Sequence, residues 1–158
     1  MNNSKKPFHE ENYQQKDRDF YPVLGISCEL GKTKISFRAL ADTGCDGGIV
    51  LLKNEVDILA REYKGFELGD RINEEPLEVC VADGHVIGFD VYPVKLELGG
   101  EMRVVELWVV DPDNIIRHQR EEQTAAKHIF PAVGRSFLNH FNVMFHGRER
   151  KVSVFKEA

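Results

Sequence analysis

The chain has 158 residues, of which 42% are hydrophobic and 30% are charged, and its formal net charge is -5 at pH 7. This length suits a single domain with a packed core. An acidic chain lacks the basic surface that displaces counterions from phosphates, so the composition argues against a nucleic-acid partner. No run approaches the roughly 18 apolar residues of a membrane span, and the first residues lack the apolar stretch of a secretory signal. We therefore expect a cytoplasmic protein with no membrane partner.

Residues 1–19 are rich in Asn, Gln, Lys and Glu and show almost no apolar periodicity. Such a segment cannot offset its ordering entropy by burying apolar surface. The sequence therefore predicts a flexible N-terminal tail over residues 1–19, followed by one domain over residues 20–158.

The first half of this domain predicts β-strands joined by tight turns, followed by a helix. Residues 21–41 contain two alternating apolar runs around a turn at Gly31 and Lys32, which is typical of a β-hairpin. A short apolar strand follows at 47–52. Residues 53–64 have apolar side chains at helical spacing, so we expect a short amphipathic helix there.

The second half is also rich in β-forming residues. Residues 77–98 contain two such runs broken at 82–85, where an Asp-Gly pair favours a tight hairpin, and a further strand follows. The polar segment 111–128 is expected to be an inserted loop or short helix. Residues 129–155 predict an apolar strand ending at Gly134, then a short helix and two more strands.

The tripeptide Asp42, Thr43 and Gly44 stands at the end of the predicted hairpin. Alone it is weak evidence for a site, because Asp and Gly are ordinary turn formers. Its setting is more informative: apolar residues precede and follow it, an Ala-Asp-Gly hairpin comes later, and Ala-Val-Gly-Arg at 132–135 comes last. In this order the sequence, over residues 21–155, resembles the retropepsin-like aspartic proteases of the retroviral type (clan AA).

The resemblance implies a mostly β fold: a closed barrel with a flap hairpin and one or two short helices, acting as half of a two-fold dimer. It makes Asp42 the catalytic carboxylate. Thr43 would link the two active-site loops through hydrogen bonds, and Gly44 would hold the loop open to the substrate.

The flap tip of the family corresponds to the later hairpin of this chain. The resemblance assigns Ala82, Asp83, Gly84 and His85 to the flap and to substrate binding. For His85 the alternative is an ordinary solvent-exposed turn residue.

A second match lies in a pair of charged residues. Retroviral members have an acid four residues after the catalytic Asp, and it pairs with an Arg that follows the late glycine. Asp46 and Arg135 stand at these places, so the resemblance implies an ion pair that ties the Asp42 loop to the late helix. Asp46 would also lie in the substrate site, whereas Gly134 and Arg135 would give structural support.

Besides the small Ala132 and the inserted segment 111–128, two departures from the family pattern lie in the Asp42 loop. Cys45 replaces the usual small residue after the tripeptide, and Gly47 and Gly48 are expected to make the following turn looser. Cys45 could itself be a nucleophile, but Asp42 and Asp46 flank it and would disfavour its thiolate form. Neither departure removes a catalytic atom.

The chemistry implied by the resemblance needs two carboxylates that share one proton. The chain has one Asp-Thr-Gly and no Asp-Ser-Gly, so the second carboxylate must come from a second copy. The expected protein is a homodimeric aspartic endopeptidase, a hydrolase whose two Asp42 side chains activate a water that attacks a peptide or protein substrate. The strand predicted at Lys151–Phe155 could join the dimer sheet or simply close a monomeric barrel.

Other interpretations stay open. The same fold could serve as a non-catalytic dimerisation or peptide-binding module, or the tripeptide could be a coincidental turn in a β-barrel scaffold. The six histidines and three cysteines show no metal-binding spacing, so we expect no metal and no cofactor. Trp108 and the late phenylalanines Phe130, Phe137, Phe141 and Phe145 are expected to fill the core.

Overall fold

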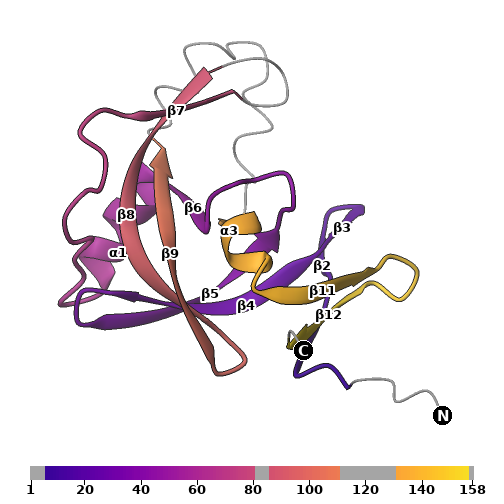
Figure 1. The fold of residues 1–158 in the computed structure, drawn as a ribbon. Coiled ribbons are helices and arrows are strands. Elements are labelled where there is room, and N and C mark those ends of the chain that lie inside the picture. The colour runs from indigo at the N-terminus through magenta and orange to yellow at the C-terminus, as the bar shows by residue number, and fades with distance from the viewer. Residues whose placement is uncertain (1–5, 81–85, 111–130, 157–158) are drawn as a thin grey trace.

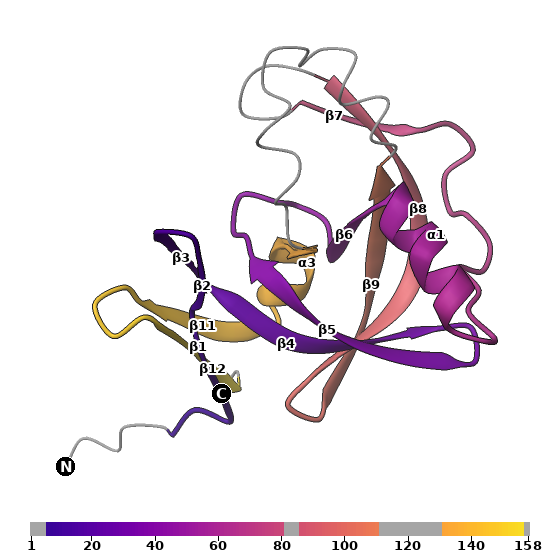
Figure 2. The same ribbon diagram turned by 180° about the vertical axis from the view of Figure 1, so that it is seen from behind.

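The computed structural model describes residues 6–80, 86–110 and 131–156, and Figures 1 and 2 show its ribbon from opposite sides. Most strands belong to one sheet with the order β4-β5-β10-β6-β9-β8-β7. Because β4 also pairs with β8, six of these strands close into a barrel and β7 extends its rim. The strands of this sheet are β4 (Val23–Leu30), β5 (Thr33–Ala41), β6 (Ile49–Leu52), β7 (Leu77–Cys80), β8 (Val86–Leu98), β9 (Glu101–Val110) and β10 (Ala132–Val133).

The antiparallel hairpins of the barrel follow the alternating pattern of the sequence. β4 and β5 pair along the whole of β4, and the side chains of β4 alternate between the core and the outer face. Gly31 in their turn has φ +64°, a left-handed conformation that glycine adopts without strain. The hairpin predicted at 21–41 and the paired strands predicted within 77–98 are confirmed.

The main hydrophobic core fills the barrel. Its largest fully buried side chain is Phe137, which comes from the short helix α3 (Arg135–Leu138). The fully buried aliphatic side chains around it include Leu24, Ile26, Leu30, Ile49, Leu51, Leu96, Leu98 and Leu107. Burying each large apolar side chain stabilises the fold by about 1.5 to 3 kcal/mol. The expected fold class, a mostly β barrel with short helices, is thus confirmed.

Helix α1 (Lys53–Glu62) follows β6 directly and covers one side of the barrel (Figure 1). The carboxylate of Glu55 accepts a hydrogen bond from the main-chain N–H of Leu52, 2.8 Å away, which satisfies a donor at the helix start. Val56 packs into the core. The helix predicted at 53–64 is confirmed and ends at Glu62.

A second, three-stranded sheet lies on the other side of the barrel from α1 in both views (Figures 1 and 2). Its order is β1-β12-β11, with β12 in the middle. The strands are β1 (His9–Asn12), β11 (Phe141–His146) and β12 (Lys151–Lys156), and a small hairpin of β2 (Gln14–Lys16) and β3 (Asp19–Tyr21) follows β1.

The prediction of a flexible tail over residues 1–19 is wrong for residues 9–12, 14–16 and 19, which lie in β1, β2 and β3. β1 pairs with β12 over four residues, and polar side chains add further anchors. The carboxylate of Glu11 accepts hydrogen bonds from the main-chain N–H of Gly25 and from Arg38, the latter at 2.9 Å. These contacts add to the apolar packing of Phe8 and Tyr13, which lie against the main core.

A polar network joins β1 to the rest of the small sheet. Ser153 is a buried polar residue on β12, and its hydroxyl donates to the Glu10 carboxylate at 2.8 Å and contacts His146 Nε2 at 3.0 Å. Lys151 Nζ lies 3.4 Å from the same carboxylate. The hydrogen bond from Ser153, helped by the charge of Lys151, lowers the pKa of Glu10 against a smaller opposing effect of desolvation.

The segments 82–85 and 111–128, expected to be a hairpin turn and an insertion, lie outside the described residues. In the part of the chain that the structure describes, no helix is both long enough and apolar enough to cross a membrane.

We predict that Glu10→Gln destabilises the protein at pH 7 and has a smaller effect at pH 3. The lowered pKa of Glu10 means that its ionised form stabilises the fold. This contribution is complete above the unfolded-state pKa, about 4.5, and is lost as the pH falls through the lower folded-state value. Urea unfolding at both pH values measures the difference.

The matched control for this test is Glu62→Gln, which changes an exposed carboxylate at the end of α1. It is expected to leave the unfolding midpoint nearly unchanged at both pH values. If Glu10→Gln behaved like this control at pH 7, the network around Ser153 would contribute nothing to stability.

Candidate active site

Asp42 follows the last residue of β5 and is held by the neighbouring strand. Its main-chain N–H donates to the carbonyl of Val133 on β10 at 3.0 Å. β5 and β10 run parallel, with Ala41 opposite Val133, so the two chain segments arrive at the site side by side. The position of Asp42 is therefore set by the barrel itself.

The Asp42 side chain organises its own turn. The main-chain N–H of Gly44 donates to Asp42 Oδ1 at 2.8 Å, and the N–H of Cys45 donates to the Asp42 carbonyl at 3.3 Å. This is the local bonding that Asp often makes in turns. Asp42 is half-buried, whereas Thr43 and Gly44 are exposed, so the tripeptide reaches the surface of the single chain.

Gly134 packs directly against the loop that follows Asp42. Its N–H donates to the Gly48 carbonyl at 3.1 Å, and the next N–H, of Arg135, donates to the Cys45 carbonyl at 2.7 Å. A Cβ atom on Gly134 would collide with the carbonyl oxygens of Gly47 and Cys45. Glycine is required here because two main-chain segments touch, which agrees with the structural support expected of Gly134.

Asp46 and Arg135 contact each other, as the resemblance implied. Arg135 Nη2 donates to Asp46 Oδ1 and forms an ion pair with it. The Arg135 side chain is 49% exposed and the Asp46 side chain is 62% exposed. Ion pairs in contact with water contribute about 0 to 1 kcal/mol, so this pair orients the two side chains more than it stabilises the fold.

The glycine pair after Asp46 makes a tight contact, contrary to the expectation of a looser turn. Gly47 and Gly48 are buried, and the N–H of Gly48 donates to the Glu106 carbonyl on β9 at 3.1 Å. A Cβ atom on Gly47 would lie 2.9 Å from Cδ2 of the Trp108 indole. The absence of side chains therefore allows the loop to lie flat on β9.

Trp108 is a site neighbour that sequence reasoning missed. It is buried, as expected, and it lies in the smaller of two buried core clusters, together with Phe89, Val91 and Val110. The Gly-Gly pair at 47–48 is the signal that could have indicated a close contact. It did not reveal which side chain the loop would meet.

Cys45 is poorly suited to act as a nucleophile. It is half-buried, and burial raises the pKa of its thiol, with a further contribution from the nearby charges of Asp42 and Asp46. The opposing effects of the Gly47 main chain and Arg135 are insufficient to reverse this shift. A thiolate is the reactive form of cysteine, so this environment disfavours the alternative of a cysteine nucleophile.

The flap residues Ala82, Asp83, Gly84 and His85 lie outside the described residues, so their contact with a substrate stays a prediction. The strands on either side are described: Cys80 of β7 pairs with Val86 of β8. Within the described ranges, no group of three or more His, Cys, Asp or Glu side chains is arranged to hold a metal ion.

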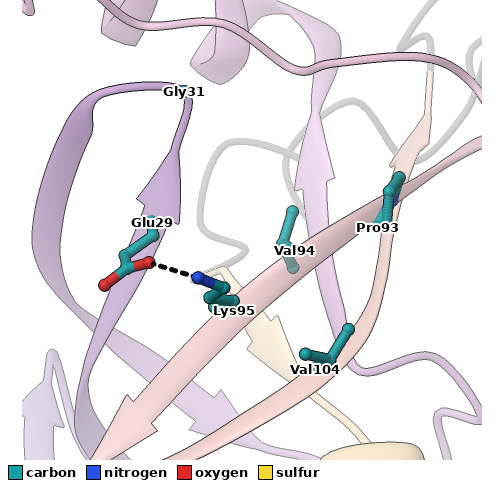
Figure 3. A pocket seen from close by; sticks show the side chains of 6 residues that line it. All are labelled: Glu29, Gly31, Pro93, Val94, Lys95 and Val104. Carbon is teal, nitrogen blue, oxygen red and sulfur yellow. Dashed lines mark ion pairs between the residues drawn. The ribbon is translucent and has the colours of Figure 1, made fainter.

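An open pocket lies away from this loop, on β4, β8 and β9 and the turn after β4 (Figure 3). Lys95 Nζ and Glu29 Oε2 form an ion pair across it at 3.4 Å. The residues lining it are Glu29, Gly31, Pro93, Val94, Lys95 and Val104. It contains no residue of the predicted site.

Comparison with known proteins finds similarity to solved structures and none in sequence. No protein-family model matches the chain, and no curated protein sequence matches it. Among solved structures the chain is similar to EIAV protease complexed with the inhibitor HBY-793, with a TM-score of 0.48 and 16% sequence identity. The similarity covers 80% of this chain and 92% of that chain.

We predict that Gly134→Ala destabilises the protein by about 1 to 3 kcal/mol, the usual cost of adding an atom to a closely packed site. The new methyl group would push the main chain of Gly47 and Cys45 away and weaken two hydrogen bonds. Denaturant unfolding monitored by circular dichroism measures the loss of stability.

Gly147→Ala is the matched control, because a Cβ atom there has no neighbour within 4 Å. It is expected to leave stability unchanged or slightly raised. Equal stability of the two variants would contradict the close fit of Gly134 into the loop.

Proposed function

We propose that this protein is an aspartic endopeptidase that acts as a homodimer. The observation that carries the proposal is the structure of the Asp42 loop. The Asp42 carboxylate accepts a hydrogen bond from the Gly44 N–H, and the N–H groups of Gly134 and Arg135 donate to carbonyls of the same loop. The Asp46 and Arg135 contact supports it further, because an ordinary turn requires no such pair.

In the proposed reaction the two Asp42 carboxyl groups of the dimer share one proton. The ionised carboxylate removes a proton from water, and the water oxygen attacks the carbonyl carbon of the peptide bond. The protonated carboxyl gives its proton to the carbonyl oxygen. When the tetrahedral intermediate breaks down, the amide nitrogen receives a proton and leaves as an amine. No cofactor or metal takes part.

The small sheet suggests where a second copy would bind. β12, the sequence candidate for a dimer strand, lies between β1 and β11, so both of its edges are already paired. β11 is an outer strand, and it carries two exposed apolar side chains, Met144 and Phe145. An outer strand of this kind can pair with another chain. We therefore assign the dimer contact to β11.

We predict that wild-type protein cleaves an unstructured protein substrate between about pH 4 and pH 7 and that Asp42→Asn lowers the rate by about 10²-fold or more. The amide keeps the size of the side chain but cannot take up or supply the shared proton. A peptide library analysed by mass spectrometry gives the rate. Specific activity should also fall on dilution, because two chains form one site.

Asp57→Asn on α1 is the control for this substitution and should keep wild-type activity. No cleavage by folded, dimeric wild-type protein would contradict the proposal and favour a peptide-binding module.

We predict that Met144→Lys raises the dimer dissociation constant by about 10-fold or more, because each copy would place a charge in an apolar contact. Sedimentation velocity over a dilution series measures the constant. Val104→Lys changes a still more exposed apolar residue, on β9, and should leave the dissociation constant unchanged. An unaltered constant in Met144→Lys, with normal stability in urea, would exclude β11 as the contact.

A further inference from the structure

The loop that follows Asp42 lies on the indole ring of Trp108. A Cβ atom placed on Gly47 would be 2.9 Å from Trp108 Cδ2 and 3.2 Å from both Cε2 and Cε3. Cδ2 and Cε2 form the bond shared by the two indole rings, and Cε3 is bonded to Cδ2. The main chain at Gly47 therefore lies against the centre of the ring system. Trp108 is only 7% exposed, because this loop and its neighbours cover it.

The indole is held in a fixed orientation. Trp108 Nε1 donates to Glu106 Oε2 at 2.8 Å, two residues earlier on the same face of β9. The main-chain carbonyl of Glu106 accepts the N–H of Gly48 at 3.1 Å. β9 thus holds the loop at two adjacent points, through a ring contact at Gly47 and a main-chain hydrogen bond at Gly48.

The same indole also contacts β8, which leads toward the predicted flap, and its cluster packs against β7. The Phe89 ring of β8 lies 5.3 Å from the Trp108 ring, centre to centre. The cluster that contains both rings also packs against Val79 of β7 and Ile87 of β8. Trp108 therefore stands between the Asp42 loop and the β7–β8 pair.

A short path of contacts leads from Trp108 to Asp42. The indole supports Gly47, and the carbonyls of Cys45 and Gly48 on either side of it accept the N–H groups of Arg135 and Gly134. The N–H of Asp42 is in turn bonded to Val133, the residue before Gly134. A shift of the loop on the indole would therefore also move the segment that fixes Asp42.

We propose that Trp108 is a positioning residue: its indole sets the position of the Gly47–Gly48 main chain and couples the Asp42 loop to strands β7 and β8. Its effect on catalysis rests on the proposed protease function. Its contact with the loop does not, so the two can be tested apart.

The first test uses the fluorescence of Trp108, which is the single tryptophan of the chain. Gly47→Ala places a methyl group against the indole and is expected to shift the emission maximum and change quenching by acrylamide in the folded protein. Gly147→Ala, with no neighbour near the added atom, should leave both unchanged. Identical emission from Gly47→Ala and wild type would overturn the contact.

The second test compares kinetics. Trp108→Phe removes the hydrogen bond to Glu106 and part of the ring contact with Gly47. It should lower kcat by roughly 10-fold with a smaller change in KM, because misplaced catalytic groups slow the chemical step more than they weaken binding. Leu96→Val trims a buried side chain in the main core, and should lower stability while kcat stays at the wild-type value. If both variants kept the wild-type kcat, Trp108 would be a packing residue only.

The two tests separate the two proposals. A wild-type protein without protease activity would contradict the proposed function, and the emission of Gly47→Ala would still decide whether the indole holds the loop. A wild-type protease whose emission and kcat are insensitive to both substitutions would contradict the role of Trp108 alone.

Discussion

The arrangement of the candidate site depends on the contact between Gly134 and the loop that follows Asp42. β10 pairs with β5 and with β6 over only two residues each, so these strand pairings alone hold β10 weakly. The N–H groups of Gly134 and Arg135 add to them by donating to the carbonyls of Gly48 and Cys45 in the loop between β5 and β6. Only a residue without Cβ permits this approach. These backbone contacts thus hold β10 in the barrel and shape the loop at the same time.

Much of the fold could be predicted because local patterns specify it. β4 and β5 alternate between core and outer face, and Gly31 marks their turn, so the hairpin follows from residues that are close in sequence. The pairing of Asp46 with Arg135 could be expected from the family resemblance, since both stand at matching places. By contrast, the position of β1 depends on Glu10, Glu11 and the packing of Phe8 on Phe141, and most of these partners lie far away along the chain. A search for apolar periodicity cannot detect such polar anchors.

The role of Trp108 shows another limit of pattern reasoning. Alternation along β9 correctly separates Val105, Leu107 and Val109, which face the main core, from Trp108 on the outer face. It does not show that a distant loop covers that outer face. The covering depends on the path of the chain between β5 and β6, which tertiary contacts determine.

Binding of a second chain would change the strength of some contacts around Asp42 and leave others as they are. The bonds made by Gly134 and the packing of Gly47 on Trp108 are main-chain or buried contacts that already exist in one copy. The Asp46 and Arg135 pair is exposed and therefore weakly stabilising in one copy. Covering by a partner would lower the local dielectric constant and strengthen the attraction between the two charges, although their desolvation would oppose it. In the proposed dimer, association would thus bring the Asp42 carboxylate of the second copy to an Asp42 loop whose backbone conformation is already fixed within one chain.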